Sequence, residues 1–241
     1  MINNIERPSL LVIVRHAESE RNAAKKGNVY FSTEESASCV RGVPDHEVPI
    51  TGLGVGQASV TGVHIRERFG VFDVVYDSGY LRTEQTRDGI LKAYTPQERA
   101  GMKLRTSDLI RERDTGFTYD MTTDEVDRYF PWLKAYWREF GYFYARPPGG
   151  ESQSDVCERV YRFVGNLFSM RAGNKVLVVT HGGTARAFRY NLEKWTGKMY
   201  VEKMEEARLE NCGLVVYQYN PETGRLELKE HGTTYWQRKE E

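Results

Sequence analysis

Three short runs of apolar residues stand out along an otherwise polar chain, at residues 10–14, 72–76 and 176–180. Each run is apolar almost throughout rather than alternating, which is typical of strands buried on both faces of a parallel sheet. Turn-forming residues follow the second and third runs, and segments that can form helices come next, from Leu81 and at residues 184–192. The pattern predicts repeated units of strand, turn and helix.

Two longer segments with helical composition or periodicity fall between these strands, at residues 55–69 and 152–170. In the second, the apolar side chains fall on one helix face: Val156, Val160, Phe163, Val164 and Leu167. Alternating strands and helices favour an α/β fold, and we expect a three-layer α/β/α sandwich around a mostly parallel sheet. Near the carboxyl end, residues 214–219 and 226–229 predict a strand and an edge strand joined by a turn.

The length of 241 residues fits a single domain over residues 1–241, with insertions at about 23–40 and 116–150. Residues 27–38 contain three Ser and two Glu and lack periodicity, so we expect an exposed loop there. The stretch around His46 is likewise expected to be a solvated loop rather than a metal site, because adjacent residues do not face one ligand centre.

The second insertion has helical signals of its own. Thr122 and Glu125 have the spacing of a capping box, and Pro131 suits the first turn of a following helix. Its aromatic residues have the composition either of a surface that stacks nucleobases or sugars or, as we expect, of the packing face of a small helical subdomain. They are Tyr129, Phe130, Trp132, Tyr136, Trp137, Phe140, Tyr142, Phe143 and Tyr144.

Composition narrows the function further. Lys plus Arg equals Asp plus Glu at 34 each, so net charge gives no reason to expect binding to nucleic acid or to an anionic membrane. Three cysteines, Cys39, Cys157 and Cys212, form neither a metal-binding spacing nor a disulfide framework. Residues 1–9 hold no apolar leader, so we expect a cytoplasmic protein. The sequence predicts no particular oligomeric state.

The chemistry is expected where the strands end, because ligands of open α/β sheets bind beyond the carboxyl ends of the strands. Arg15 and His16 leave the first strand, Arg82 follows the second, and His181 follows the third. Two arginines and two histidines in one crevice would form a cationic, donor-rich pocket that suits a phosphate ester. A cysteine-based phosphatase motif and a phosphate-binding Gly-x4-Gly-Lys loop are both absent from the sequence.

These residues lie in motifs that resemble the signature of the histidine phosphatase superfamily, which includes cofactor-dependent phosphoglycerate mutases. The motifs are RHAES at 15–19 with Asn22 after it, residues 42–51, SGYLRTEQT at 78–86, RERDTG at 111–116, GGES at 149–152 and THGGTARA at 180–187. They span most of the chain in the family's order, and each strand-end motif follows an expected strand.

The resemblance implies roles for individual residues. His16 would attack phosphorus and form a phosphohistidine intermediate, because a neutral imidazole is available near neutral pH. Donors to the transferring phosphoryl group would be Arg15, Asn22, Arg82, His181 and the backbone at Gly182. The general acid, and then the base that activates water, would be Glu112. No metal and no cofactor is implied, since arginines supply the positive charge.

Three features differ from the simplest family pattern. Ala17 stands where glycine is commonest, which requires only an ordinary negative φ. The loop between Asn22 and Arg41 is longer than in the simplest mutases. No adjacent basic pair follows Glu112 to bind a substrate carboxylate, which favours hydrolysis over mutase chemistry.

The interpretation is therefore a metal-independent phosphatase acting on small-molecule phosphate monoesters. Two alternatives stay open: a cofactor-dependent phosphoglycerate mutase, and a non-catalytic module that binds a phosphorylated ligand. For the acid, Glu18, Glu84 and Glu151 are alternatives to Glu112, which could also simply pair with a neighbouring arginine.

Overall fold

The structure is a computed structural model that describes residues 7–237. Most of the polar segment 1–9 and both ends of the predicted domain 1–241 lie outside the described residues.

Within residues 7–237, six strands form one sheet in the order β3-β2-β4-β1-β5-β6. Their bounds are β1 Leu10–Arg15, β2 Val74–Asp77, β3 Lys103–Thr106, β4 Lys175–Thr180, β5 Leu214–Asn220 and β6 Arg225–Thr233. Strands β1 to β4 pair in parallel, whereas β5 is antiparallel to both β1 and β6. The expected mostly parallel sheet is confirmed.

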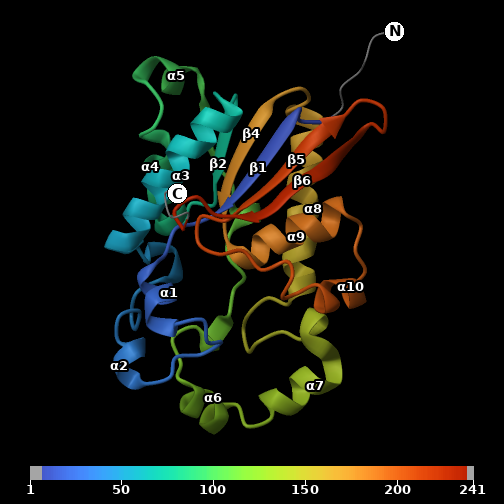
Figure 1. Ribbon diagram of the computed structural model, residues 1–241. Coiled ribbons are helices and arrows are strands. Elements are labelled where there is room, and N and C mark those ends of the chain that lie inside the picture. The colour runs from blue at the N-terminus through green and yellow to red at the C-terminus, as the bar shows by residue number, and fades with distance from the viewer. Residues whose placement is uncertain (1–6, 238–241) are drawn as a thin grey trace.

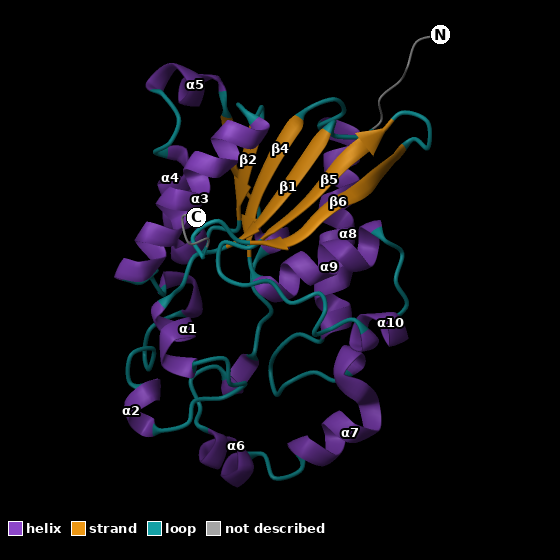
Figure 2. Ribbon diagram, in the orientation of Figure 1, coloured by secondary structure: helices purple, strands orange, loops and turns teal. Residues whose placement is uncertain are grey.

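Helices cover both faces of this sheet (Figures 1 and 2). Strand β1 shows why, because successive side chains point to opposite faces and both sets are buried. Leu11 and Ile13 belong to the apolar core under helices α8 (Gln153–Met170) and α9 (Gly182–Leu192). Val12 and Val14 belong to the core on the opposite face of the sheet, under α3 and α4. Their bounds are α3 Gly52–Phe69 and α4 Leu81–Leu91. The three-layer α/β/α arrangement follows.

Six further helices lie within residues 7–237. Four of them lie beyond one end of the sheet in Figure 1: α1 Glu20–Lys25, α2 Glu34–Ala37, α6 Thr123–Tyr129 and α7 Leu133–Tyr144. The remaining two are α5 Pro96–Gly101 and α10 Gly197–Glu202, and single 3-10 turns are η1 Asp45–Glu47, η2 Asp108–Ile110 and η3 Gly116–Thr118. No helix within residues 7–237 combines the length and the apolar character that crossing a bilayer requires.

One strand was not expected from the sequence. β3 pairs only with β2 and lies at the sheet edge, and all four of its side chains are exposed. It therefore lacks the apolar run that marks a strand buried on both faces, and it carries two basic residues, as edge strands often do.

The expectation of an exposed loop at residues 27–38 is only partly right, because most of the segment is exposed but two of its side chains are not. Phe31 and Ala37 are fully buried and form a small apolar cluster with Val40 and Val48. The segment includes α2, and Phe31 forms an isolated β-bridge with Thr122 of the second insertion. Two apolar residues of this segment are thus buried although Val29 is exposed, and the lack of a periodic pattern gave no sign of them.

The helical second insertion is present as expected. Thr122 caps α6 and forms a capping box with Glu125. Pro131 lies ahead of α7, whose N-cap is Trp132. The aromatic run is only partly a packing face, because Phe143 is buried whereas four of its members are exposed: Tyr129, Trp132, Phe140 and Tyr144.

Two glycines set the close approach of α3 and α4. A Cβ on Gly62 would lie 2.5 Å from the carbonyl oxygen of Ile90, and one on Gly89 would lie 2.7 Å from the Cβ of Ala58. Because the first obstacle is backbone, the helices would have to separate to admit a methyl group.

We therefore expect Gly62→Ala to lower the free energy of unfolding by about 1–3 kcal/mol through overpacking. Gly56→Ala is the matched control in the same helix, because nothing lies within 4 Å of its Cβ position. It should raise the free energy of unfolding by up to about 1 kcal/mol, since alanine is the better helix former. Urea unfolding measures both, and equal effects of the two substitutions would contradict the close-packing account.

Candidate active site

The parallel pairing of β1 and β4 brings the two histidines together. Arg15 is opposite Thr180 in the register, and the backbone N–H of His16 donates to the Thr180 carbonyl at 2.7 Å. His16 and His181 follow these paired residues and therefore lie at the same edge of the sheet. Their ring centroids are 5.1 Å apart in an edge-on contact. Both rings are buried.

The backbone fixes the tautomer of His16. Its Nδ1 lies 2.7 Å from the carbonyl oxygen of Ala17, which can only accept a hydrogen bond. Nδ1 therefore carries the proton and Nε2 bears the lone pair. Burial lowers the pKa of His16 well below its ordinary value, and the nearby charges of Arg82 and Arg15 lower it further. The neutral ring with its lone pair on Nε2 has the form that a nucleophile requires.

Ala17 fits where the family pattern has glycine. It has an ordinary negative φ, as expected, and is fully buried. Its N–H donates to Thr86 Oγ1 at 2.9 Å, so the backbone after the nucleophile is tied to α4.

Arg15 is anchored at one end of its guanidinium group. Nη1 donates to the Leu209 carbonyl at 2.6 Å, whereas Nε is buried without a hydrogen-bond partner among the described residues. Gly182 lies against this guanidinium, because a Cβ built there would be in ordinary van der Waals contact with Nε at 3.5 Å. Gly182 begins α9, where the first backbone N–H groups have no partner within the helix and can donate to an anion.

Arg82 of α4 is buried, and Asp45 of the 3-10 turn η1 holds its guanidinium group. It donates to the Asp45 carbonyl at 2.5 Å, makes an ion pair with the Asp45 carboxylate at 3.1 Å, and lies over the ring of Tyr80. The expectation of a solvated loop around His46 is therefore incomplete. His46 is exposed, but its neighbour Asp45 fixes a predicted phosphate ligand.

A chain of hydroxyl groups orients His181. Thr83 Oγ1 donates to the Tyr80 carbonyl at 2.7 Å and therefore accepts from Ser78 Oγ at 2.9 Å. Ser78 Oγ has then used its single proton, so it accepts from His181 Nε2 at 2.9 Å. Nδ1 of His181 lies 3.7 Å from Glu112 Oε2. Nδ1 of His181 can donate to a phosphate oxygen only when the ring is protonated to the imidazolium. Burial and the charge of Arg82 lower the pKa of His181 and so disfavour that form, whereas a bound dianion would favour it.

Asn22 is linked to the segment of His16 through Asn211. Its Oδ1 accepts from the backbone of Ser19 at 3.4 Å and from Asn211 Nδ2 at 3.2 Å. Asn211 also donates to the His16 carbonyl at 3.0 Å, which links the two segments. Because Oδ1 is engaged, Nδ2 of Asn22 is the atom suited to donate to a phosphate oxygen.

Glu112 lies beside both histidines. One atom each from His16, Glu112 and His181 lies within 4.8 Å of the others. Glu112 Oε1 accepts from the backbone N–H of Arg113 at 2.9 Å, and among the described residues the carboxylate is paired with no arginine or lysine. These three side chains have the atom types of a metal site, but the guanidinium groups of Arg15 and Arg82 lie next to them, and their charge opposes a cation.

The alternative acids are engaged or lie elsewhere. Glu151 makes ion pairs with Arg111 at 2.5 Å and with the buried Arg159 at 3.0 Å. Glu18 accepts from Thr51 at 2.9 Å, and Glu84 lies in the first turn of α4. Neither belongs to the cluster with the histidines. Arg159 also donates to the Glu112 carbonyl at 3.0 Å, so the pair with Glu151 holds the backbone of Glu112 in place.

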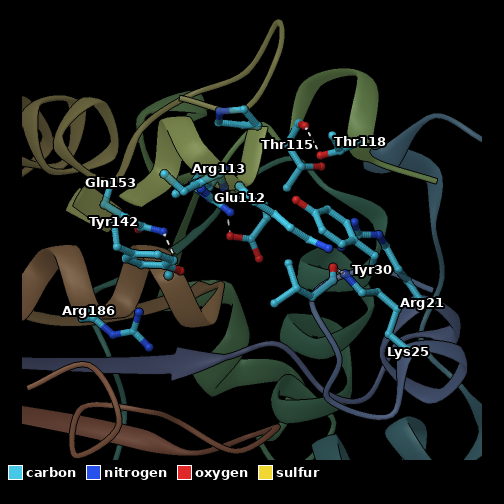
Figure 3. Close-up of a pocket in the computed structure, with 15 residues that line it drawn as sticks. Arg21, Lys25, Tyr30, Glu112, Arg113, Thr115, Thr118, Tyr142, Gln153 and Arg186 are labelled. Carbon is cyan, nitrogen blue, oxygen red and sulfur yellow. Dashed lines mark hydrogen bonds between the residues drawn. The ribbon is translucent and has the colours of Figure 1, made fainter. Parts of the chain in front are cut away.

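A cavity of about 580 Å³ opens from Glu112 toward the two insertions (Figure 3). It is lined by Arg21, Lys25, Val29, Tyr30, Glu112, Arg113, Thr115, Thr118, Lys134, Trp137, Tyr142, Pro147, Gln153, Gly183 and Arg186. Trp137 and Tyr142 thus bring part of the aromatic run to this wall. A second, smaller cavity of about 220 Å³ adjoins Asp45 and Tyr80.

Several of these residues were not identified from the sequence. Ser78 stands within a recognised motif, but its role depends on the hydroxyl chain to His181. Asn211 and Lys25 lie in segments without a strand-end context, and only the folded chain brings them to the site.

Comparison with known proteins identifies the family. The family model described as "Histidine phosphatase superfamily (branch 1)" matches residues 11–232. The chain belongs to this superfamily. A 2,3-bisphosphoglycerate-dependent phosphoglycerate mutase of Nitrobacter winogradskyi is 28% identical over 219 residues, which cover 88% of this chain and 92% of that protein.

Solved structures of the histidine phosphatase superfamily share the fold. The α-ribazole phosphatase of Shigella flexneri superposes with a TM-score of 0.72 at 18% identity, covering 93% of this chain and 96% of that one. A mycobacterial glucosyl-3-phosphoglycerate phosphatase superposes with a TM-score of 0.70 at 20% identity, covering 94% and 100%. The resemblance inferred from the motifs is confirmed: the chain is an enzyme of the histidine phosphatase type.

The low pKa of His16 is directly testable by NMR of the ring nitrogens. In the wild-type protein the ring should remain neutral at pH values well below about 6.5, the usual histidine pKa. Arg82→Gln should raise the pKa, because the arginine charge is the largest cause of its depression after burial. Arg162→Gln, at an exposed position of α8, is the control and should leave the pKa unchanged. A wild-type pKa near or above 6.5 would contradict the account.

Proposed function

We propose that the chain hydrolyses phosphate monoesters of small molecules through a phosphohistidine intermediate, without a metal ion. The observation that carries the proposal is the state of His16. Its ring is buried, neutral and oriented by its own backbone, with the lone pair on Nε2. Arg15, Arg82 and His181 surround it, and a carboxylate within 4.8 Å completes the site.

The first step transfers the phosphoryl group to the protein. Arg15, Arg82, Asn22 and the first turn of α9 donate to the phosphoryl oxygens, which positions phosphorus and offsets charge that develops on them. Nε2 of His16 forms a bond to phosphorus as the bond to the ester oxygen breaks. Glu112 gives its proton to that oxygen, so the leaving group departs as an alcohol.

The second step restores the enzyme. The Glu112 carboxylate accepts a proton from water as the water oxygen bonds to phosphorus. The bond to Nε2 breaks, which releases inorganic phosphate and leaves Glu112 protonated for the next cycle. Because the guanidinium groups neutralise the phosphoryl charge, the chemistry needs no divalent cation.

Two observations favour hydrolysis over mutase chemistry. A mutase must hold a small phosphorylated acid while that acid reorients beside the phosphohistidine. It must also keep water away from this intermediate. The cavity of about 580 Å³ is of the size that accommodates ligands much larger than a three-carbon acid. The segment after Glu112 also lacks an adjacent basic pair. Phosphoglycerate mutase stays the second candidate, because curated relatives carry that name.

We expect the wild-type protein to hydrolyse p-nitrophenyl phosphate in the presence of a chelator. His16→Ala should lower kcat/KM by about 10³-fold or more, because it removes the nucleophile. The half-buried residue His64 of α3, which lines neither cavity, supplies the matched control, and His64→Ala should keep wild-type activity.

Three outcomes would contradict the proposal. Loss of activity on chelation would point to a metal enzyme. Tight phosphate binding without turnover would point to a non-catalytic phosphate-binding module. Isomerisation of 3-phosphoglycerate faster than its hydrolysis, with a bisphosphorylated primer present, would make the enzyme a mutase.

The role of Glu112 predicts a dependence on the leaving group. Glu112→Gln should lower kcat by about 10²–10⁴-fold for an alkyl phosphate, whose alkoxide needs a proton. The loss in the phosphorylation step should be much smaller for p-nitrophenyl phosphate, because nitrophenolate leaves without one. Glu18→Gln is the control and should affect both substrates alike. Burst kinetics separate the two steps, and equal losses in phosphorylation for both substrates would exclude Glu112 as the acid.

A further inference from the structure

Glu112 lies on a segment that no regular structure holds in place. Residues 111–115 lie between the 3-10 turns η2 and η3 and belong to neither a helix nor a strand. A group that transfers a proton in the reaction has to be placed accurately, because a displacement of about 1 Å can lower the rate by about 10²-fold. The contacts that hold this segment therefore bear on the chemistry of the carboxyl group.

Arg159 of α8 bridges two carbonyl groups of residues 109–114, which we call the Glu112 loop. Its side chain is buried, and Nη1 donates to the Leu109 carbonyl at 2.9 Å while Nη2 donates to the Glu112 carbonyl at 3.0 Å. A guanidinium group is planar and rigid, so these two bonds set the separation of the two carbonyl groups. The backbone of Glu112 thus depends on a side chain 47 positions away in the sequence.

Glu151 fixes the orientation of the Arg159 guanidinium. Its Oε1 accepts from Arg159 Nε at 3.0 Å and its Oε2 accepts from Nη2 at 3.1 Å, which makes the pair bidentate. Oε2 also accepts from the backbone N–H of Asp114 at 3.0 Å, and the Glu151 N–H donates to the Asp114 carbonyl at 2.9 Å. The pair therefore holds the chain at Glu112 itself and two residues after it.

Two threonines hold the carbonyl groups between Leu109 and Glu112. Thr180 Oγ1 donates to the Ile110 carbonyl, and Thr184 Oγ1 donates to the Arg111 carbonyl, both at 2.7 Å. Thr180 ends β4 and Thr184 lies in the first turn of α9, so both threonines flank His181. These bonds attach the Glu112 loop to the strand end that carries the histidine.

The position of the backbone determines the position of the carboxylate. Glu112 Oε1 accepts from the backbone N–H of Arg113 at 2.9 Å, and Oε2 lies 3.7 Å from Nδ1 of His181. Because the donor to Oε1 belongs to the loop itself, the carboxylate moves when the loop moves. A contact that shifts the Glu112 carbonyl would therefore also shift the carboxylate relative to the histidines.

Net stability alone is a weak reason for the buried pair of Arg159 and Glu151. Desolvation of both charges offsets most of their attraction, so such pairs contribute little to the free energy of unfolding. Glu151 is also paired with Arg111 at 2.5 Å, so it has a second cation. The specific feature of Arg159 is the pair of directed bonds to the loop carbonyls.

We infer that Arg159 is a positioning residue for the general acid: held by Glu151, it keeps the backbone of Glu112 where the carboxyl group can protonate the leaving oxygen. This inference rests on the proposed function, because it takes Glu112 as the acid. Arg159 lines neither of the two cavities, so it acts through Glu112 rather than on the substrate. Its importance should therefore follow the need of the leaving group for a proton.

The test measures kcat/KM for phosphate monoesters that range from p-nitrophenyl phosphate to an alkyl phosphate. In a mechanism with a phosphoenzyme, kcat/KM covers the steps up to departure of the leaving group and excludes the later attack of water. Arg159→Met should lower kcat/KM by about 10²-fold for the alkyl phosphate but by less than about threefold for p-nitrophenyl phosphate, because only the alkoxide needs the displaced acid. Equal losses for the two substrates would overturn the inference.

The substitution is chosen so that the protein keeps its fold. Methionine is unbranched and fills the apolar space of the arginine stem, while Glu151 keeps its bonds to Arg111 and to the backbone of Asp114. Arg159→Lys carries the same test with the charge retained, because an ammonium group cannot span both carbonyls. Its loss should also be confined to the alkyl phosphate and should be smaller, at about tenfold. No selective loss in either variant would overturn the inference.

Arg189→Met is the matched control. Arg189 is likewise buried and makes a bidentate pair with a carboxylate, but its hydrogen bonds go to Glu193 of its own region instead of the Glu112 loop. The substitution should lower the free energy of unfolding and affect both substrates alike. A selective loss for the alkyl phosphate in this control would show that any buried arginine produces the effect, which would remove the assignment to Arg159.

A double variant keeps this inference apart from the proposed function. In the Glu112→Gln protein, adding Arg159→Met should cause no further selective loss for the alkyl phosphate, because the acid through which Arg159 acts is already gone. A further selective loss of the same size as in the wild-type background would leave Glu112 as the acid and remove the positioning role. Equal effects of Glu112→Gln alone on the two substrates would instead remove the acid itself, and the positioning role with it.

Discussion

The parallel pairing of β1 with β4 is the constraint on which the site depends. It places two histidines 165 positions apart in sequence at one sheet edge, joined by the hydrogen bond from the His16 backbone to the Thr180 carbonyl. Strand ends buried on both faces allow little freedom, so the rings contact each other before any ligand arrives. The catalytic geometry is thus a property of the sheet core, and the loops add to it.

Positive charge is concentrated around the two histidines, and it affects the protonation of both rings. Burial lowers the pKa of His16 and of His181, and the charges of Arg82 and Arg15 lower both further. Both rings are therefore held in the neutral form. Asp45 offsets part of this charge by pairing with Arg82. A phosphate dianion offsets the rest, so substrate binding itself would bring His181 to its donating form.

The sequence was most informative where chemistry and burial coincide. Apolar strands mark β1 and β4, and the residues that follow them identify both histidines and the family. Strand β3 has no such pattern because it is an exposed edge strand. Residues 27–38 have a polar composition, which gave no sign that Phe31 and Ala37 belong to a small apolar cluster. Partners such as Asp45 depend on contacts between distant segments, which periodicity does not encode.

The two insertions contact each other and together supply much of the cavity wall. Phe31 bridges to Thr122, and Arg41 pairs with Glu125 at 2.7 Å. Arg21 donates to the Tyr119 carbonyl at 2.9 Å and lies over its ring, so contacts across the insertions fix this cavity cation in place. The histidines and arginines at the sheet edge and the cavity wall formed by the insertions are therefore separate parts of the site. Substitutions in the insertions can change the shape of the cavity wall, and hence substrate selectivity, without changing the groups at the sheet edge that would set the rate of phosphoryl transfer.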